Sequence, residues 1–190
     1  IEKFGFKLLD EKPFKVKVAQ GEQVYICDFG VEVPDGLVGK IKDQQLVAKL
    51  KAAIVAAFTR EVESDTLNKL VLYSGLTARQ VSLIRAVVKY MAQTSLPFSA
   101  GYMSECLKNH AAVSRCLFDL FEAKFCPEHH SAAKAGEIQQ LVNAELNKVE
   151  NLAEDQILKA AFSVVNAMIR TNYYQTLDDG AHKPYISFKL

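Results

Sequence analysis

The stretch SGLTARQVSLIRAVVKYMAQ, residues 74–93, decides the fold class because it carries a complete signal for a helix start and a buried helical face. Thr77 and Gln80 have the spacing of a capping box. Leu76 and Val81 flank that box and can pack together as a hydrophobic staple. Apolar residues then recur at helical spacing: Val81, Ile84, Val88 and Met91. A helix over about residues 77–93 is therefore expected.

The helical period extends through the chain from about residue 42. The first long helix has a stripe of apolar residues four apart: Leu46, Leu50, Ile54, Phe58 and Val62. Further helices are expected over residues 65–73, 99–108, 110–125, 132–151 and 154–174. The last of these is apolar on two edges, which indicates burial among several helices. About six or seven helices are expected in total.

The first 35 residues follow a different period. Phe4, Phe6 and Leu8 alternate with polar neighbours, as in a half-buried strand, and the alternation resumes after Pro13. A turn is expected at residues 19–22, before a second extended run that places these residues on one face: Tyr25, Cys27, Phe29, Val31 and Val33. We expect two or three antiparallel strands. The predicted fold is thus mainly α with a small N-terminal antiparallel β element (α+β): residues 1–41 form that element and residues 42–190 a multi-helix, bundle-like domain.

The second extended run contains Asp28-Phe29-Gly30, the tripeptide that holds magnesium in protein kinases. A kinase also needs a glycine-rich loop, a strand lysine and an HRD catalytic loop before this tripeptide. Only 27 residues precede Asp28, and none of these motifs occurs in the sequence. The tripeptide is therefore interpreted as part of a strand with an exposed aspartate.

Composition limits the classes of function. The 190 residues are 49% hydrophobic and 24% charged, with a net charge of +1, so no field directs the protein to nucleic acid or an anionic membrane. No apolar run is long enough to span a bilayer, and the charged N-terminus is no signal peptide. Four cysteines in apolar contexts favour reduced thiols in a cytoplasmic protein. The absence of an initiator Met and the abrupt end at PYISFKL suggest a piece of a larger protein.

A metal site was considered in CLFDLFEAKFCPEHH, which gathers Cys116, Cys126, His129 and His130. Zinc binds thiolates and imidazoles, but this spacing matches no established ligand pattern. Buried thiols beside a solvated His-His loop are the favoured interpretation. A Cys–His nucleophile pair with His110, His129, His130 or His182 lacks any supporting signature.

No nucleotide-binding motif is present. The nine glycines include no Gly-x-Gly pair, which excludes the Rossmann fingerprint, and no P-loop occurs. The segment RTNYYQ, residues 170–175, combines an arginine, two tyrosines and two amides at an expected helix end. These residue types favour a protein docking surface. No catalytic, cofactor-binding or metal-binding residue is therefore assigned.

Several stretches together resemble the large bacterial NAD-specific glutamate dehydrogenases. They are LLDEKPFKV (8–16), VYICDFGVEV (24–33), the block from Ser74 to Pro127, IRTNYYQ (169–175) and KPYISFKL (183–190). The block from Leu76 to Pro127 is the most specific, and residues 127–140 match least. The resemblance implies the end of an ACT-type regulatory module followed by a helical connector that leads into the catalytic region.

By this resemblance, the parent protein oxidises L-glutamate to 2-oxoglutarate and ammonia with NAD. The segment itself would be non-catalytic and would bind no cofactor. Its expected partners are the upstream ACT-type and the catalytic domains of the same chain, in a homo-oligomer, with no nucleic acid or membrane. Relay of regulation and static scaffolding remain equally open. The alternatives are a free-standing module that binds an effector amino acid at the β element and, less favoured, a small zinc protein.

Overall fold

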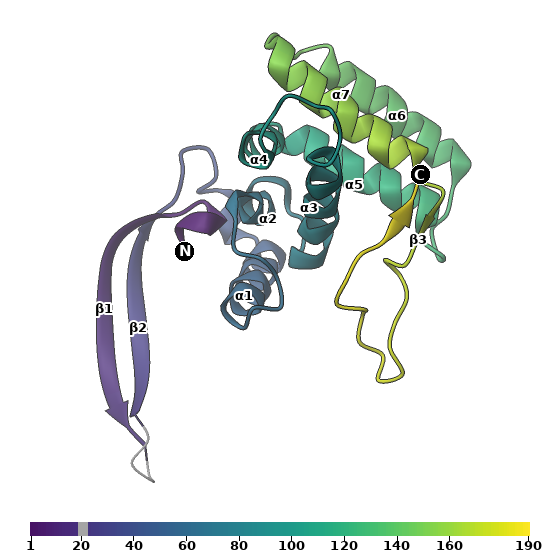
Figure 1. Cartoon of the computed structure of the whole chain (residues 1–190). Helices are drawn as coiled ribbons and strands as arrows, with labels where there is room; N and C mark the ends of the chain where they lie inside the picture. The colour runs from purple at the N-terminus through teal and green to yellow at the C-terminus, as the bar shows by residue number, and fades with distance from the viewer. Residues whose placement is uncertain (19–22) are drawn as a thin grey trace.

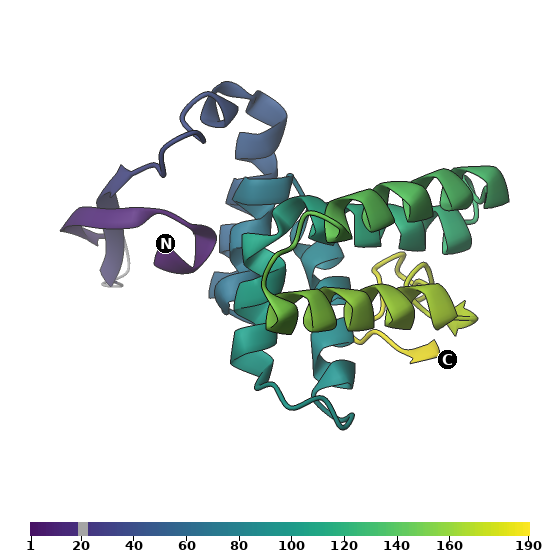
Figure 2. The same cartoon turned by 90° about the horizontal axis from the view of Figure 1, so that it is seen from above.

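The computed structural model describes residues 1–18 and 23–190, which form a helical core and a long β-hairpin that projects from it (Figures 1 and 2). The described residues contain seven α-helices: α1 (Gln44–Phe58), α2 (Leu70–Ser74), α3 (Ala78–Met91), α4 (Ala100–Asn109), α5 (Ala111–Phe125), α6 (Ala132–Leu146) and α7 (Leu152–Ala167). The strands are β1 (Lys7–Lys17), β2 (Gln23–Glu32), β3 (Arg170–Thr171) and β4 (Phe188–Lys189). Short 3-10 helices are η1 (Glu2–Phe4), η2 (Lys40–Lys42) and η3 (Thr66–Lys69). The mainly α fold with a small antiparallel β element is confirmed.

Side-chain caps start the helices where the sequence indicates. Thr77 and Gln80 form the expected capping box at the start of α3. Ser99 accepts a hydrogen bond from the Tyr102 amide at the start of α4. Gly75 ends α2 with a φ of 70°, a left-handed conformation that glycine adopts without a steric penalty. Local sequence chemistry thus sets the boundaries in this part of the chain.

The core is built around α3 and α5, which lie among the other helices (Figure 1). The apolar residues that the sequence predicts to face inward on α3 are buried: Val81, Ile84, Val88 and Met91. On α5 the buried apolar residues include Val113, Leu117, Leu120 and Phe121. Complete burial of a large apolar side chain stabilises the folded state by about 1.5–3 kcal/mol. This shared interior makes residues 44–168 one packed unit. Within the described residues, no helix has the length and apolar character needed to cross a membrane.

Three helix predictions were wrong in detail. Phe58 was expected on the buried stripe of α1, yet it is 90% exposed because the core ends at Leu50 and Ala53. Helix α6 ends at Leu146 instead of continuing to residue 151. Helix α7 ends at Ala167, because the backbone turns at Met168 and residues 170–171 pair with β4 instead of continuing the helix.

The N-terminal expectations were also partly wrong. Phe4 belongs to η1 and is buried against the helices instead of alternating along a strand. β1 runs without interruption through Pro13 and pairs antiparallel with β2. Neither strand is half-buried: almost all their residues are exposed, because the hairpin extends away from the core (Figure 1). The turn expected at residues 19–22 lies outside the described residues.

Candidate interdomain surface

The hairpin presents apolar side chains on both faces. Partners in the antiparallel register share a face, so the pairs Phe14–Ile26 and Val16–Val24 lie together near the tip. The pair Leu8–Val31 lies on the opposite face. This is the face on which the sequence predicts Tyr25, Cys27 and Phe29. The large exposed apolar residues of the hairpin are Leu8, Leu9, Phe14, Val16, Val24, Tyr25, Ile26, Phe29 and Val31. An apolar surface of this extent marks an interaction site.

The hairpin also has free edges. Among the described residues, β1 and β2 form a two-stranded sheet, so the outer edge of each strand has no neighbouring strand. Such an edge exposes unpaired amides and carbonyls and can accept a further strand. A lone hairpin is at best marginally stable in water. The geometry therefore fits two strands of a larger sheet that other residues complete.

The Asp28-Phe29-Gly30 tripeptide has a structural role in this hairpin. Gly30 lies opposite Asp10, next to the register shift between Leu8 and Asp10. A β-carbon on residue 30 would lie 1.9 Å from Asp10 Oδ1, so a side chain there would displace the aspartate. The strand interpretation is confirmed, since the tripeptide lies within β2.

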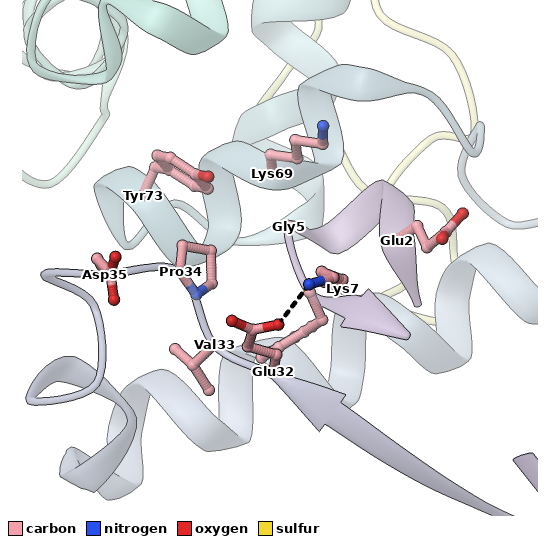
Figure 3. Close-up of a pocket in the computed structure, with 10 residues that line it drawn as sticks. Glu2, Gly5, Lys7, Glu32, Val33, Pro34, Asp35, Lys69 and Tyr73 are labelled. Atoms are coloured by element: carbon pink, nitrogen blue, oxygen red, sulfur yellow. Dashed lines mark hydrogen bonds and ion pairs between the residues drawn. The ribbon is translucent and has the colours of Figure 1, made fainter. Parts of the chain in front are cut away.

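A shallow pocket of about 420 Å³ lies where the hairpin meets the core (Figure 3). Its charged residues have both signs, and Lys7 Nζ lies 2.8 Å from Glu32 Oε2 across the strands. That carboxylate raises the pKa of the exposed Lys7 ammonium. Tyr73 and Lys69 form the wall on the helical side. The pocket therefore offers both cationic and anionic groups to a small polar ligand.

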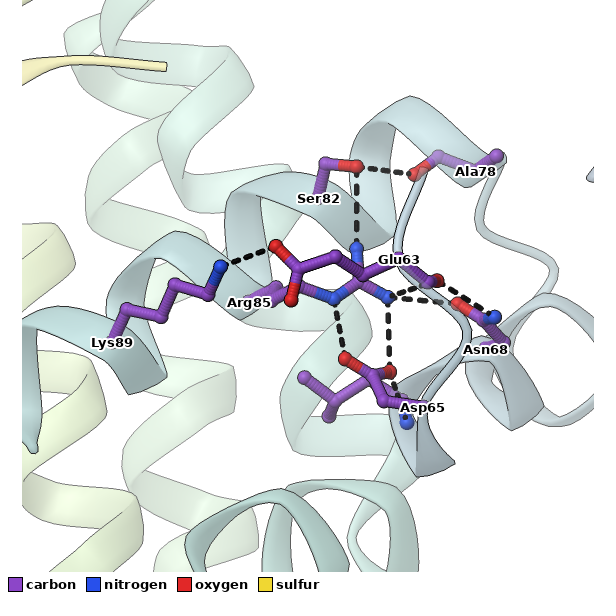
Figure 4. Close-up of polar contacts among 8 residues, drawn as sticks. Glu63, Asp65, Asn68, Ala78, Ser82, Arg85 and Lys89 are labelled. Carbon is purple, nitrogen blue, oxygen red and sulfur yellow. Dashed lines mark hydrogen bonds and ion pairs between the residues drawn. The ribbon is translucent and has the colours of Figure 1, made fainter. Parts of the chain in front are cut away.

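A buried polar cluster fixes the chain that leads from α1 into the core (Figure 4). Arg85 of α3, which is 6% exposed, donates to both carboxylate oxygens of Asp65, at 2.5 and 2.9 Å. It also donates to Asn68 Oδ1 at 2.7 Å and to the Glu63 carbonyl at 3.4 Å. Asp65 in turn caps η3 by accepting from the Leu67 amide. This cluster therefore positions the 63–68 segment against α3.

The four candidate metal ligands do not converge. Cys126 is buried at the end of α5 and Cys116 is partly buried within it, whereas His129 and His130 are exposed. Across residues 1–18 and 23–190, no group of three or more His, Cys, Asp and Glu side chains could hold a metal ion. Burial raises the pKa of the Cys116 thiol, which disfavours the thiolate that zinc requires.

The candidate Cys–His chemistry has no geometric support in the described part of the chain. His110 Nε2 lies 2.8 Å from Glu154 Oε2, and this contact joins the start of α5 to the start of α7. The Cys106 thiol lies 3.8 Å from the Glu154 carbonyl oxygen. Burial raises the pKa of Cys106 to about 12, so the thiol stays protonated and is not a nucleophile at neutral pH.

The segment 170–175 was predicted to be a docking surface, and for its central residues this prediction was wrong. Asn172 and Tyr173 are buried. Tyr173 packs edge-to-face on Phe121, at 5.2 Å between ring centroids. The Asn172 side chain donates to the Tyr185 carbonyl and accepts from the Ser187 amide. These two hydrogen bonds close the base of the C-terminal loop, residues 173–183. The aromatic and amide groups therefore anchor this loop to the core.

Comparison with known proteins gives three family matches in order along the chain. The ACT3 domain of glutamate dehydrogenase matches residues 1–46, and helical motif 3 of glutamate dehydrogenase matches residues 62–127. The catalytic domain of bacterial NAD-glutamate dehydrogenase matches residues 141–190. The last match associates residues 141–190 with the catalytic domain, whereas the sequence pattern grouped them with the preceding helices.

Curated relatives agree with these matches. NAD-specific glutamate dehydrogenases of Pseudomonas aeruginosa and Mycobacterium tuberculosis are 33% and 34% identical to this chain, and that of Halomonas elongata is 29% identical. Each comparison covers the whole chain and 12% of the relative's length. The chain is thus related to the glutamate dehydrogenases. Within them the chain is similar over its whole length to a part of the bacterial NAD-specific enzymes, which confirms the resemblance noted in the sequence.

Proposed function

We propose that this chain is the segment of an NAD-dependent glutamate dehydrogenase that joins an ACT-type module to the catalytic region. One observation carries the proposal: the ACT3, helical-motif and catalytic matches follow each other along one chain. The hairpin, with two exposed apolar faces, supports it, because such a surface needs partners beyond the described residues. Residues 1–41 would complete the ACT-type module, the helices that follow would form the connector, and residues 141–190 would begin the catalytic region.

The activity proposed for the whole protein is the oxidation of L-glutamate to 2-oxoglutarate and ammonia with NAD in the cytoplasm. We assign no reacting or NAD-binding residue to this chain. Its contribution would be to hold the upstream module and the catalytic region at a fixed distance within a homo-oligomer. Relay of an effector signal would require in addition two arrangements with different ligand preference.

The proposal is tested by extending the chain at its N-terminus through the rest of the ACT-type module. Hydrogen exchange of the β1 and β2 amides is measured in the extended protein and in the 190-residue chain. We expect slower exchange and less self-association in the extended protein, because added strands and helices would cover the edges and apolar faces. Equal exchange in both proteins would contradict the proposed docking of the hairpin.

A second candidate function is the binding of an effector amino acid, and the pocket of Figure 3 favours it. Ammonium and carboxylate groups of opposite sign lie at its rim, as the recognition of a zwitterion requires. A thermal-shift panel of amino acids tests it, since a ligand that binds the folded state raises the melting temperature. The change Lys69→Gln should abolish the shift, and Lys134→Gln, on α6 and outside the pocket, is the control. The absence of any shift at high ligand concentration would refute this candidate.

A further inference from the structure

We propose that Arg79 is the residue that fixes the C-terminal loop, residues 173–183, on the helical core and so positions the first part of the catalytic region. The second half of this statement rests on the function proposed above. Arg79 lies in the first turn of α3, within the helical-motif match, and the loop lies within the catalytic-domain match. The contact therefore joins two regions that the family comparison treats separately.

The Arg79 guanidinium contacts both legs of the loop. Its Nη2 donates to the Tyr173 carbonyl at 2.5 Å, and its Nη1 donates to the Lys183 carbonyl at 3.4 Å. The guanidinium carbon also lies 4.6 Å from the centre of the Tyr173 ring, within cation–π range. One side chain thus sets the spacing between two residues that are ten positions apart in the sequence.

Arginine suits this position better than lysine does. The guanidinium is planar, so it can stack on an aromatic ring while its two terminal nitrogens donate in fixed directions. A lysine ammonium could reach one carbonyl but could not hold both carbonyls and the ring in one geometry. Both hydrogen-bond acceptors are main-chain carbonyls, so Arg79 holds the backbone of the loop, and the Tyr173 ring adds one side-chain contact.

The rest of the loop has few contacts with the core. Residues 175–182 are exposed, and their backbone hydrogen bonds are internal to the loop, such as Leu177 N to the Ala181 carbonyl at 2.7 Å. At the base, Phe188 packs edge-to-face on Tyr90 of α3, with 5.8 Å between ring centroids. The base is therefore anchored near the C-terminal end of α3, while Arg79 anchors the two legs at its N-terminal end.

This arrangement makes Arg79 a positioning residue in the proposed dehydrogenase. Helix α1 follows the hairpin in the chain and packs against α3. Helix α3 therefore contacts both α1 and, through Arg79, the C-terminal loop. Contiguity alone does not demonstrate coupling, and a perturbation of the contact is needed. If the loop sets the geometry of the catalytic region, its release will lower turnover even though Arg79 touches no reacting group.

The test uses the full-length protein that carries this chain, with Arg79→Gln, Arg79→Lys and the control Arg115→Gln. Arg115 pairs with Asp119 one turn further along α5, so the control removes the same charge from a contact within a single helix. Hydrogen exchange by mass spectrometry follows residues 174–184, with α5 as an internal reference. Steady-state kinetics with glutamate and NAD are measured on the same preparations.

For Arg79→Gln we expect exchange in the loop to become about tenfold faster, with α5 unchanged, because a charge-assisted contact to both legs is lost. We expect kcat/KM to fall roughly tenfold or more, with a smaller fall for Arg79→Lys and none for Arg115→Gln. If Arg79→Gln also speeds exchange in α5, loop exchange and kcat/KM are compared between Arg79→Lys and Arg115→Gln instead. Faster loop exchange and lower kcat/KM in Arg79→Lys alone would then support the proposal.

Unchanged loop exchange would overturn the anchoring role of Arg79. Faster loop exchange with unchanged kinetic constants would overturn its positioning role. A wild-type protein that does not reduce NAD with glutamate would overturn the proposed function, and the exchange data would still decide the anchoring role.

Discussion

Replacing Arg85 by methionine should lower the free energy of unfolding by about 3 kcal/mol. The change removes the only cation that contacts the Asp65 carboxylate among the described residues and leaves Asn68, which is 3% exposed, without its donor from Arg85. Methionine fills a similar apolar volume, so the loss reports the polar contacts more than a cavity.

The magnitude follows from burial. Breaking a buried ion pair by removing one partner costs about 3–5 kcal/mol, because the remaining charge is left unpaired. The Arg85 side chain is 7% exposed, but that of Asp65 is 34% exposed, so water can partly solvate the remaining carboxylate. The expected loss therefore lies at the lower end of this range. For a chain of this size, it corresponds to a fall in Tm of about 6–12 °C.

Urea unfolding followed by circular dichroism measures the loss, with the slope of the transition compared between variants. Arg115→Met is the matched control, because its pair with Asp119 has side chains that are 40% and 27% exposed. The control should lose at most about 1 kcal/mol. A loss below about 1 kcal/mol for Arg85→Met, equal to the control, would refute the argument that this cluster secures the entry into the core.

Three further results are expected. Gly75→Ala should destabilise the folded state by about 1 kcal/mol, because the φ of Gly75 is 70°. Gly136→Ala should stabilise it by roughly 0.5–1 kcal/mol, because Gly136 lies within helix α6 with open space around it. Urea unfolding of both variants checks this difference in sign. Exposed Cys27 should react with iodoacetamide at pH 8, whereas Cys106, whose pKa burial raises to about 12, should be modified only after unfolding, as mass spectrometry can show. Phe58→Ser should change stability by at most about 0.5 kcal/mol because Phe58 is 90% exposed; a loss of several kcal/mol in thermal unfolding would mean that the side chain is buried.

The helices could be predicted because their signals are local. The Thr77 and Gln80 capping box depends on a few adjacent residues and forms as expected. The Ser99 cap at the start of α4 is equally local. The inward residues of α3 and α5 follow from helical spacing alone, because these helices lie inside the core and are covered on their apolar side.

The errors occur where a partner distant in sequence decides the structure. The apolar alternation in β1 and β2 was interpreted as burial, yet the described residues provide nothing that covers those strands. Apolar spacing alone could not show that the core ends before Phe58. The end of α7 depends on pairing with Phe188, which a helical pattern cannot reveal.

The same reason explains the polar residues that the sequence did not reveal. Arg79 and Arg85 are six residues apart on a helix whose polar positions are expected to face solvent. Arg85 is buried because Asp65 and Asn68 lie across from it. Arg79 is half-buried because the C-terminal loop folds back over α3. For the Arg85–Asp65 contact, the sequence did offer one local signal: Asp65 is a capping residue, at the start of η3 just before α2.

The central claim, that these residues connect an ACT-type module to the catalytic region of a dehydrogenase, is tested most directly on the native protein. An antibody raised against the 21.1 kDa chain is used to probe fractions of a lysate from the source organism for size and for NAD-dependent glutamate oxidation. The claim predicts a band far larger than the chain, in the fractions that oxidise glutamate. A band at the size of the chain alone, separate from that activity, would contradict it.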